Sequence, residues 1–351
     1  MIRLLDHRSP GAEAELIEEL RILLNDDTGL FENTEAKKEL LASYTQSCRH
    51  RVSGRRITVR LSELAGNLER KADWLTGYLQ NHEWIDGGAD EGWFNSYYDD
   101  HGRAVEGFFP NEVRMMLTGQ VFSIMGNVAS EQQIRRIVNS ADHYLYRKEI
   151  GGYRLNTNFH ELKFDTGRMF GFAYGEKENG AVFSHMTVMY ANALYRRGFA
   201  KEGWKALKTL ADTALDFDTS RIYPGIPEYF RSDGRGMYHY LTGAASWFMM
   251  TMITQVFGVR GQAGDLILAP QLMAEQFDEQ GEASVSLVFA GKNLEIIYEN
   301  PDLKDSGTYT VFSAVCEGQQ LPTDDLGHVI ITRRILDTLS DDCHRVIVKL
   351  I

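Results

Sequence analysis

The stretch ASVSLVFAGKNLEIIY, residues 283–298, decides how the chain divides, because it contains two short runs rich in β-branched and aromatic residues. Gly291-Lys292-Asn293 separates the two runs, and this arrangement is typical of two short strands with turn residues between them. Further strand-like segments follow at 308–316, 328–335 and 344–351. We therefore predict that residues 265–351 form a small C-terminal β-sandwich domain.

The sequence before this tail favours helices, because apolar residues recur there at three- and four-residue spacing. The pattern predicts helices over 12–24, 61–79, 130–145, 181–198, 201–215 and 238–257. Ser130 and Gln133 have the spacing of a capping box, and Gly198 and Gly258 suit the ends of helices. We expect residues 1–264 to form a helical domain, which makes the fold class mainly α.

Composition excludes several functions. The chain has 351 residues, and its 37 basic and 49 acidic residues give a formal net charge of −12, so we expect no nucleic-acid partner. The most apolar stretch, 244–259, is interrupted by polar residues and is shorter than the roughly 20 residues of a membrane span. No signal peptide is visible, and three scattered cysteines indicate neither a disulfide framework nor a metal site. We expect a cytoplasmic protein with no membrane association.

Three stretches carry unusual residues. Residues 171–186 combine three glycines and several charges with the start of a helix, where free N–H groups suit an anion, although His185 alone is more typical of a core histidine. Residues 234–247 contain small side chains that allow close approach of a ligand or of another helix. Residues 90–100 interleave aromatic rings with carboxylates, as sugar-binding sites do, although a hairpin at the surface is equally consistent with them.

These stretches contain GEKENGAVFSHMTVMYANAL, YPGIPEYFRSDGRGMYHYLTGAASW and GDLILAPQL, which together resemble glycoside hydrolase family 94. That family comprises inverting phosphorylases of β-glucosides. YDDHGRAVEG and GGYRLNTNF are most similar to its 1,2-β-oligoglucan phosphorylase branch and to the phosphorylase-like part of cyclic β-1,2-glucan synthases. The resemblance implies part of an (α/α)6 barrel followed by the C-terminal β-domain.

The resemblance also implies roles for individual residues. His185, Thr242 and Gly243 are at the positions that bind phosphate in the family, and Lys177 and Glu178 are at positions that contact the acceptor sugar. The expected ligands are therefore an oligosaccharide and phosphate, with orthophosphate as co-substrate, no cofactor and no metal. The implied reaction is reversible phosphorolysis of β-1,2-gluco-oligosaccharides to a sugar 1-phosphate.

The sequence departs from the family at the general acid, which is an aspartate in a D-W-N-D motif that this chain lacks. In the family, the aromatic hairpin that resembles residues 90–98 lies downstream of the acid. We therefore expect the acid upstream of Met1, and the chain to be the C-terminal portion of a larger phosphorylase. Asp90 is the candidate within the chain.

Two alternatives remain open at this point. An inverting hydrolase would use Asp90 or Glu91 with Glu176 or Glu178, and would release reducing sugar without phosphate. A non-catalytic carbohydrate-binding or remnant fragment would bind sugar or phosphate without turnover. A second copy in a homodimer, or the missing N-terminal portion, is the expected protein partner.

Overall fold

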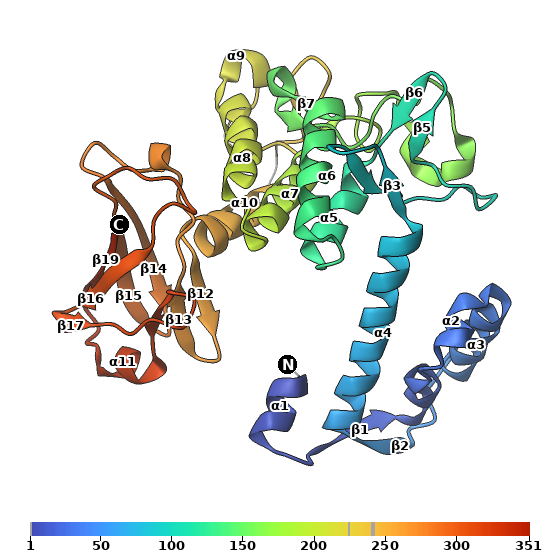
Figure 1. The fold of residues 1–351 in the computed structure, drawn as a ribbon, viewed down its shortest axis with the longest axis horizontal. Helices are drawn as coiled ribbons and strands as arrows, with labels where there is room; N and C mark the ends of the chain where they lie inside the picture. The colour runs from blue at the N-terminus through green and yellow to red at the C-terminus, as the bar shows by residue number, and fades with distance from the viewer. Residues whose placement is uncertain (1, 224, 240–242) are drawn as a thin grey trace. The chain divides into compact units, whose positions relative to one another are not determined.

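The structure is a computed structural model that describes residues 2–223, 225–239 and 243–351 (Figure 1). Contacts between residues divide the chain into two units, Met1–Glu83 and Trp84–Ile351. Each unit is described by itself. Along the described segments, no helix combines the length and the apolar character needed to cross a bilayer.

The first unit contains a two-stranded antiparallel sheet where the sequence pattern predicts a helix over 12–24. Glu13 pairs with Arg60 and Ile17 with Arg56, and a 3-10 helix follows. The prediction was wrong over residues 13–17, because they pair with a strand more than 35 residues further along the chain, which the helical spacing of Leu16, Leu20 and Leu23 does not reveal. The elements are α1 (Ile2–Arg8), β1 (Glu13–Ile17), η1 (Glu18–Leu24), α2 (Thr28–Glu32), α3 (Thr34–Ser47), β2 (Arg56–Arg60) and α4 (Leu61–His82).

The long helix α4 confirms the prediction over 61–79 and extends three residues further. Its first turns are covered, since Leu61 and Ala65 are buried. Further along, Trp74 stacks on Tyr78 with ring centroids 5.3 Å apart, and Tyr78 stacks on His82 at 4.4 Å. This aromatic row supports the helix along one side, because rings four residues apart lie on the same face.

The second unit is centred on α7 (Ser184–Arg196), a helix whose middle and C-terminal residues are almost all buried. Helices α5, α8 and α10 all contact it. Its neighbours in the chain are α5 (Leu117–Met125), α6 (Glu131–Tyr144), η2 (Lys148–Ile150), η3 (Phe164–Gly171), α8 (Ala200–Leu215), α9 (Phe217–Ser220), α10 (Gly243–Thr251) and the π-helix η4 (Met252–Val256). Because α7 is buried and packs against three other helices, it is the central helix of this unit.

Predicted helix boundaries are confirmed where residues next to the helix end cap it. Ser130 and Gln133 form the expected capping box at the start of α6, and Gly198, with a φ of +78°, follows the end of α7. The helix expected over 238–257 differs, because Tyr238 has a left-handed φ of +58° and lies outside α10. Its last turns are π-helical, as the bond from Phe257 N to Met252 O (2.8 Å) shows.

Short strand pairs shape the loops between these helices. Three are hairpins: β3 (Trp84–Asp86) with β4 (Gly92–Phe94), β5 (Gly107–Phe109) with β6 (Glu112–Arg114), and β7 (Tyr146–Arg147) with β8 (Gly152–Tyr153). A small three-stranded sheet has the order β11 (Gly236–Met237), β10 (Tyr229–Phe230), β9 (Val182–Phe183). That sheet brings the segment before α7 next to residues that precede α10.

The C-terminal part contains the predicted strands in two sheets (orange to red in Figure 1). One sheet has the order β12 (Val259–Gln262), β13 (Asp265–Leu268), β18 (Val329–Ile331). The other has the order β14 (Glu282–Phe289), β15 (Lys292–Glu299), β19 (Cys343–Leu350), β16 (Val311–Cys316), β17 (Gln319–Gln320). The two strands on either side of residues 290–291 are confirmed; they pair as an antiparallel hairpin, and β15 pairs with β19 in parallel.

One predicted strand is partly wrong. The segment 328–335 gives the short β18 and then the helix α11 (Arg333–Thr338). Thr332 causes the change, because its hydroxyl accepts a hydrogen bond from Ile335 N (3.3 Å) and so caps a helix.

For the fold as a whole, helices followed by a C-terminal multi-stranded sheet are confirmed. The (α/α)6 barrel, the β-sandwich and the boundary at residue 264 stay predictions.

Candidate functional site

The loop before α7 is held in shape by two asparagines. Asn156, fully buried, accepts from Gly180 N (2.7 Å) and donates to the Asn179 side-chain oxygen (3.2 Å). Asn179 donates in turn to Phe172 O (2.8 Å), and its own carbonyl accepts from Gly175 N (2.6 Å). Asn179, in the segment GEKENG (residues 175–180), is therefore a structural residue that fixes where its neighbours point.

The glycines of this loop allow close packing. Gly175 and Gly180 have φ angles of +92° and +74°, which side chains rarely adopt. A Cβ atom on Gly180 would overlap the ring of Tyr174, and one on Gly175 would overlap the Ser232 hydroxyl. The loop can take this shape only with glycine at both positions.

The two predicted acceptor-binding residues lie on this loop. Lys177 Nζ is 4.5 Å from the centre of the Tyr238 ring and 5.8 Å from that of Phe172, and its hydrogen bond to Tyr238 raises its pKa. Glu178 Oε1 is 3.3 Å from Arg168 Nε, while its Oε2 is buried without a hydrogen-bond partner among the described residues. Glu178 thus keeps one carboxylate oxygen available for a donor from a ligand.

His185 is the second residue of α7, and its position follows from the small sheet. Strand β9 ends at Phe183, and Ser184 N then donates to Glu228 O (2.9 Å) as the helix begins. The ring centre of His185 is 5.8 Å from that of Trp247, at 51°. A Cβ atom built on Gly243 would lie 2.9 Å from His185 Cε1, so the imidazole packs against the start of α10.

The imidazole of His185 has an unused polar atom. Its Nε2 is buried and has no hydrogen-bond partner in the part of the chain that the structure describes. Burial lowers the pKa of His185 below its usual value, which favours the neutral ring at neutral pH. The structure therefore brings together His185 and Gly243, two of the three predicted phosphate ligands; the third, Thr242, lies outside the described residues.

Three residues that the sequence did not single out stabilise this site. Tyr229 donates to Glu176 Oε2 (3.1 Å), and Arg231 Nε is 3.1 Å from Glu176 Oε1. Arg154 reaches Gly180 O and lies with its guanidinium 5.2 Å from the centre of the Tyr174 ring. These contacts join segments far apart in the chain, so no local pattern could have indicated them.

Of the two loop carboxylates that the hydrolase alternative names, Glu176 is engaged by those contacts, whereas Glu178 keeps its free Oε2. The other two acids of that alternative, Asp90 and Glu91, lie at the β3–β4 hairpin. Asp90 is exposed, and its carbonyl accepts from Asn139 Nδ2 (3.0 Å). Glu91 accepts from Tyr144 (2.7 Å) and lies 2.7 Å from His143 Nδ1.

The pKa of Glu91 does not suit a general acid. Burial alone would raise it, but the contacts with His143 and Tyr144 outweigh burial and hold it below its usual value. A carboxyl that donates a proton to a leaving group needs a raised pKa. None of the described contacts of Asp90 or Glu91 reaches the loop 171–180.

The aromatic and acidic stretch 90–100 is in large part internal structure. Trp93 and Phe94 are buried, so their faces are not open to a sugar, whereas Tyr97 and Tyr98 are 38% and 49% exposed. Buried Asp99 accepts from His101 N (2.9 Å), Arg103 N (3.0 Å) and Arg103 Nε (2.7 Å). These bonds, with the backbone bond from Arg103 foremost, lower the pKa of Asp99 to about 2.

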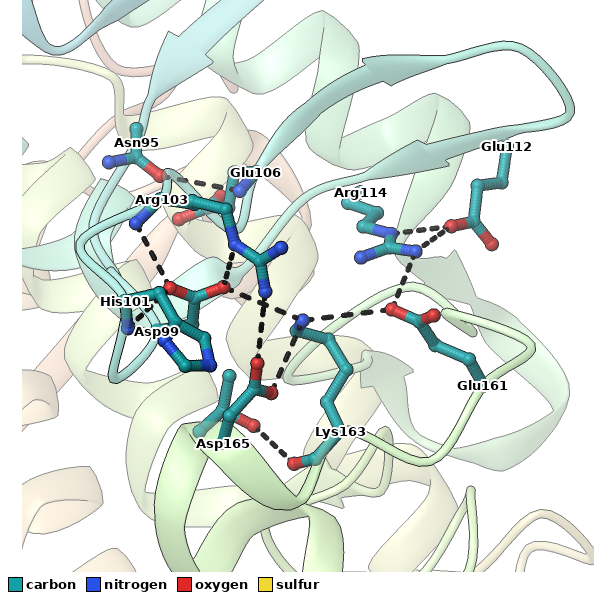
Figure 2. A network of polar contacts seen from close by, with 11 residues as sticks. Asn95, Asp99, His101, Arg103, Glu106, Glu112, Arg114, Glu161, Lys163 and Asp165 are labelled. Carbon is teal, nitrogen blue, oxygen red and sulfur yellow. Dashed lines mark hydrogen bonds and ion pairs between the residues drawn. The ribbon is translucent and has the colours of Figure 1, made fainter.

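Figure 2 shows how this carboxylate belongs to a network that ties two loops together. Asp165 bridges Arg103 Nη2 (3.2 Å) and Lys163 Nζ (3.3 Å). Arg114 continues the chain of contacts to Glu112 and to Glu161 (2.9 Å). We define the network by the residues labelled in Figure 2. Acidic and basic side chains alternate along it, so its charged groups are paired with one another. In the described residues there is no group of three His, Cys, Asp or Glu side chains that could hold a metal ion.

A model of the glycosyl hydrolase 94 superfamily catalytic domain matches residues 59–258. The chain belongs to this family. The match includes the loop 171–180, His185 and Gly243, and it ends just before β12. The resemblance seen in the motifs is therefore confirmed.

Three relatives show how distant the similarity is. The chain is 26% identical over 225 residues to cellobionic acid phosphorylase of Neurospora crassa, covering 60% of this chain and 27% of the relative. It is 23% identical over 231 residues to 3-O-β-D-glucopyranosyl-β-D-glucuronide phosphorylase of Paenibacillus borealis, covering 63% and 29%. It is 24% identical over 221 residues to cyclic β-(1,2)-glucan synthase NdvB of Rhizobium meliloti, covering 59% and 8%. The chain thus spans less than a third of each relative.

Proposed function

We propose that this chain is part of an inverting phosphorylase that transfers a glucosyl residue between a β-1,2-linked gluco-oligosaccharide and orthophosphate. The observation that carries the proposal is the apposition of His185, with its unpartnered Nε2, and Gly243 at the start of α10. Two of the three relatives are phosphorylases, and the third is named for a β-(1,2)-glucan.

The groups around His185 and the start of α10 at Gly243, called the corner from here on, suit a phosphate. A neutral imidazole with its proton on Nε2 donates one hydrogen bond, and the N–H groups at the start of α10 have no acceptor within the helix. A phosphate oxygen held there attacks the anomeric carbon from the face opposite the leaving sugar. The C–O bond to the leaving sugar breaks as the bond to phosphate forms, so the configuration inverts.

The leaving oxygen must take up a proton, and we propose that the donor is neither Asp90 nor Glu91. Asp90 is exposed, and Glu91 is held ionised by His143 and Tyr144. Our proposal assigns the proton donor to a segment outside these 351 residues, in keeping with the small share of each relative that the chain covers. No general base is needed, because phosphate is already an anionic nucleophile.

The acceptor side of the proposed site is the loop 171–180. The free Oε2 of Glu178 accepts a hydrogen bond from one sugar hydroxyl. Lys177, above the Tyr238 ring, donates a hydrogen bond to another hydroxyl. In this proposal the helices around α7 are part of an (α/α)6 barrel. Its loops carry both the phosphate-binding half-site and the acceptor-binding half-site. Orthophosphate is the co-substrate, and neither metal nor organic cofactor takes part.

A substrate that needs no protonation tests the phosphate half-site directly. The folded chain is incubated with 2,4-dinitrophenyl β-glucoside, with and without orthophosphate, and both dinitrophenolate and glucose 1-phosphate are measured. We expect release that requires phosphate, gives α-glucose 1-phosphate and falls at least tenfold in His185→Ala. The exposed His160→Asn is the matched control and should keep the rate.

Other results would contradict the proposal in distinct ways. Release that does not depend on phosphate would establish the hydrolase alternative. Its acid would then be the residue, Asp90 or Glu91, whose Asn or Gln variant loses hydrolysis of the natural oligosaccharide but still releases dinitrophenolate. A folded chain that binds β-1,2-gluco-oligosaccharides but releases nothing would establish the non-catalytic alternative. Phosphate-dependent cleavage of the natural oligosaccharide by this chain alone would place the proton donor within it.

A further inference from the structure

A pocket lies at the C-terminal end of α7. It has a volume of about 490 Å³ and lies between the C-terminal end of α7, the π-helix η4, strand β12, residues 269–271 and the start of β16. Arg196 is eleven residues beyond His185, which corresponds to roughly 16 Å along a helix. The pocket is therefore separate from the proposed phosphorylase site.

The charge around this pocket differs from that of the whole chain. The chain has 49 acidic residues, yet none of the described residues that line the pocket is Asp or Glu, whereas Arg196, Arg260 and His328 line it. The nearby Asp324 is engaged by His328, whose Nδ1 is 3.0 Å from its Oδ2. Two arginines whose pocket is lined by no carboxylate create a local site for an anion in an otherwise acidic protein.

The two arginines have no ion-pair partner in the part of the chain that the structure describes. Among the described residues, neither Arg196 nor Arg260 has a carboxylate oxygen within 4.0 Å, whereas Arg103 and Arg114 each contact two carboxylates. Guanidinium groups suit phosphate especially well, because their planar N–H fork matches two oxygens at once. This feature favours a phosphate group over a neutral ligand.

Two buried polar atoms on residues that line the pocket also have no partner in the described chain. Tyr195 is 1% exposed and its hydroxyl makes no hydrogen bond, and Gln255 is 7% exposed with an unused Oε1. The Gln255 amide nitrogen donates to the Thr254 hydroxyl (3.2 Å), and the free Oε1, as a carbonyl oxygen, can only accept. A phosphate without protons offers it no donor, but a sugar hydroxyl does.

The backbone at Gln255 supports a ligand-binding role. Gln255 belongs to the π-helix Met252–Val256, and such turns are rare and occur often at functional sites. A π-turn rotates the following side chains relative to an α-helix, and here it accompanies the placement of Gln255 at the pocket. The volume also fits one small ligand, since such sites measure about 300–1,000 Å³.

We propose that this pocket binds a small phosphorylated sugar, with the phosphate held by Arg196 and Arg260 and a sugar hydroxyl donating to Gln255 Oε1. Tyr195, whose pKa is raised by burial, keeps its proton and donates to the phosphate or to a sugar oxygen. This site stands independently of the proposed phosphorylase reaction, since no residue is shared between the two.

Calorimetric titration tests the proposal with the full chain carrying His185→Ala, so that the other anion site does not contribute. The probes are glucose 1-phosphate, glucose 6-phosphate, inorganic phosphate and succinate. We expect a sugar phosphate to bind with a stoichiometry of one molecule per chain. Arg196→Gln and Arg260→Gln should each weaken this binding at least tenfold. Arg345→Gln, an exposed arginine paired with Glu295, is the matched control and should leave binding unchanged.

A further variant separates the sugar from the phosphate. Gln255→Met keeps the length of the side chain and removes the acceptor, so it should weaken the sugar phosphates several-fold and leave inorganic phosphate unaffected. The proposal is overturned if the folded His185→Ala chain binds no sugar phosphate, if neither arginine variant weakens binding, or if succinate binds as tightly. Circular dichroism checks folding, and exposed Arg196 keeps the test usable if Arg260→Gln unfolds.

Discussion

The network of Figure 2 and the corner around His185 are both polar and both built from loops, but they differ in how their groups are satisfied. In the network, Asp99, Arg103 and Asp165 all contact a partner of opposite charge. At the corner, Glu178 Oε2 and His185 Nε2 have no partner in the described chain.

This difference separates scaffold from site. A buried polar atom without a hydrogen bond costs about 1–3 kcal/mol, so an unpartnered atom beside a family motif is a candidate contact for a ligand. The closed network fixes the loops in place and offers nothing to a ligand. The corner leaves its donors and acceptors open, and four substitutions test that contrast, in order of expected effect.

The largest effect is expected where the loop 171–180 is most tightly packed. Gly180→Ala forces a side chain onto a φ of +74° and into the Tyr174 ring, whereas Gly198→Ala meets only open space at a φ of +78°. Backbone strain costs about 1–2 kcal/mol at either position, and overpacking adds about 1–3 kcal/mol at Gly180. Urea unfolding followed by circular dichroism measures both.

We therefore expect Gly180→Ala to lose about 2–5 kcal/mol of unfolding free energy, and Gly198→Ala about 1–2 kcal/mol. Equal losses at the two positions would show that the contact with Tyr174 relaxes freely. The loop would then not be the rigid support that the proposed acceptor site requires.

The second test concerns the open atom of His185. In the Arg260→Gln background, which removes the other anion pocket, His185→Ala should weaken orthophosphate binding at least tenfold, about 1.4 kcal/mol. His185→Gln keeps an amide donor and should recover part of the affinity. Calorimetric titration gives the three dissociation constants, and unchanged affinity in His185→Ala would remove the residue from the phosphate site.

The third test breaks the closed network. Asp99→Asn keeps an oxygen for the backbone N–H groups of His101 and Arg103 but loses the charge. The folded pKa of Asp99, about 2, lies below its usual 3.8, so its ionisation stabilises the fold above pH 4. We expect the native chain to be the more stable at pH 6, and this advantage to disappear as the pH falls from about 4 to about 2.

Thermal unfolding of the native chain and Asp99→Asn across that pH range provides the measurement. A stability difference that stays constant down to pH 2 would mean that the charge of Asp99 is not what stabilises these loops. The neighbouring Asp100→Asn is the matched control, because Asp100 is exposed.

The smallest effect is expected at an exposed ion pair. Arg345 Nε lies 2.7 Å from Glu295 Oε2, and the Arg345 side chain is 69% exposed. Water screens such pairs, so Arg345→Gln should change the unfolding free energy by only about 0–0.5 kcal/mol. A loss above 1 kcal/mol by urea unfolding would mean that charge pairing at the surface contributes far more than the contrast between network and corner assumes.

The parts of the fold that the sequence predicted are those set by neighbouring residues. Helix α4, the capping box of α6 and the β14–β15 hairpin each follow from one continuous pattern. Residues 12–24 and 328–335 were mispredicted because long-range pairing in one case and a single Thr cap in the other decided the structure.

The site divides in the same way. His185 and Gly243 were indicated through family motifs, and they are 58 positions apart in a chain whose fold brings them into contact. Asn156 could not be predicted as the partner of Asn179, since an asparagine in a loop carries no local signal of a buried amide pair. Nor could the sequence show that Arg196 and Arg260 lack carboxylate partners.

The position of β19 in its sheet has a consequence for how the protein is made. Residues 343–350 lie between β15 and β16, so the last segment of the sheet to leave the ribosome is the one that joins its two halves. Until then, the β14–β15 hairpin exposes an unpaired edge that can join another chain. Parallel pairing over such a sequence separation is also slow. The interval between translation and closure is therefore when this chain is most exposed to aggregation.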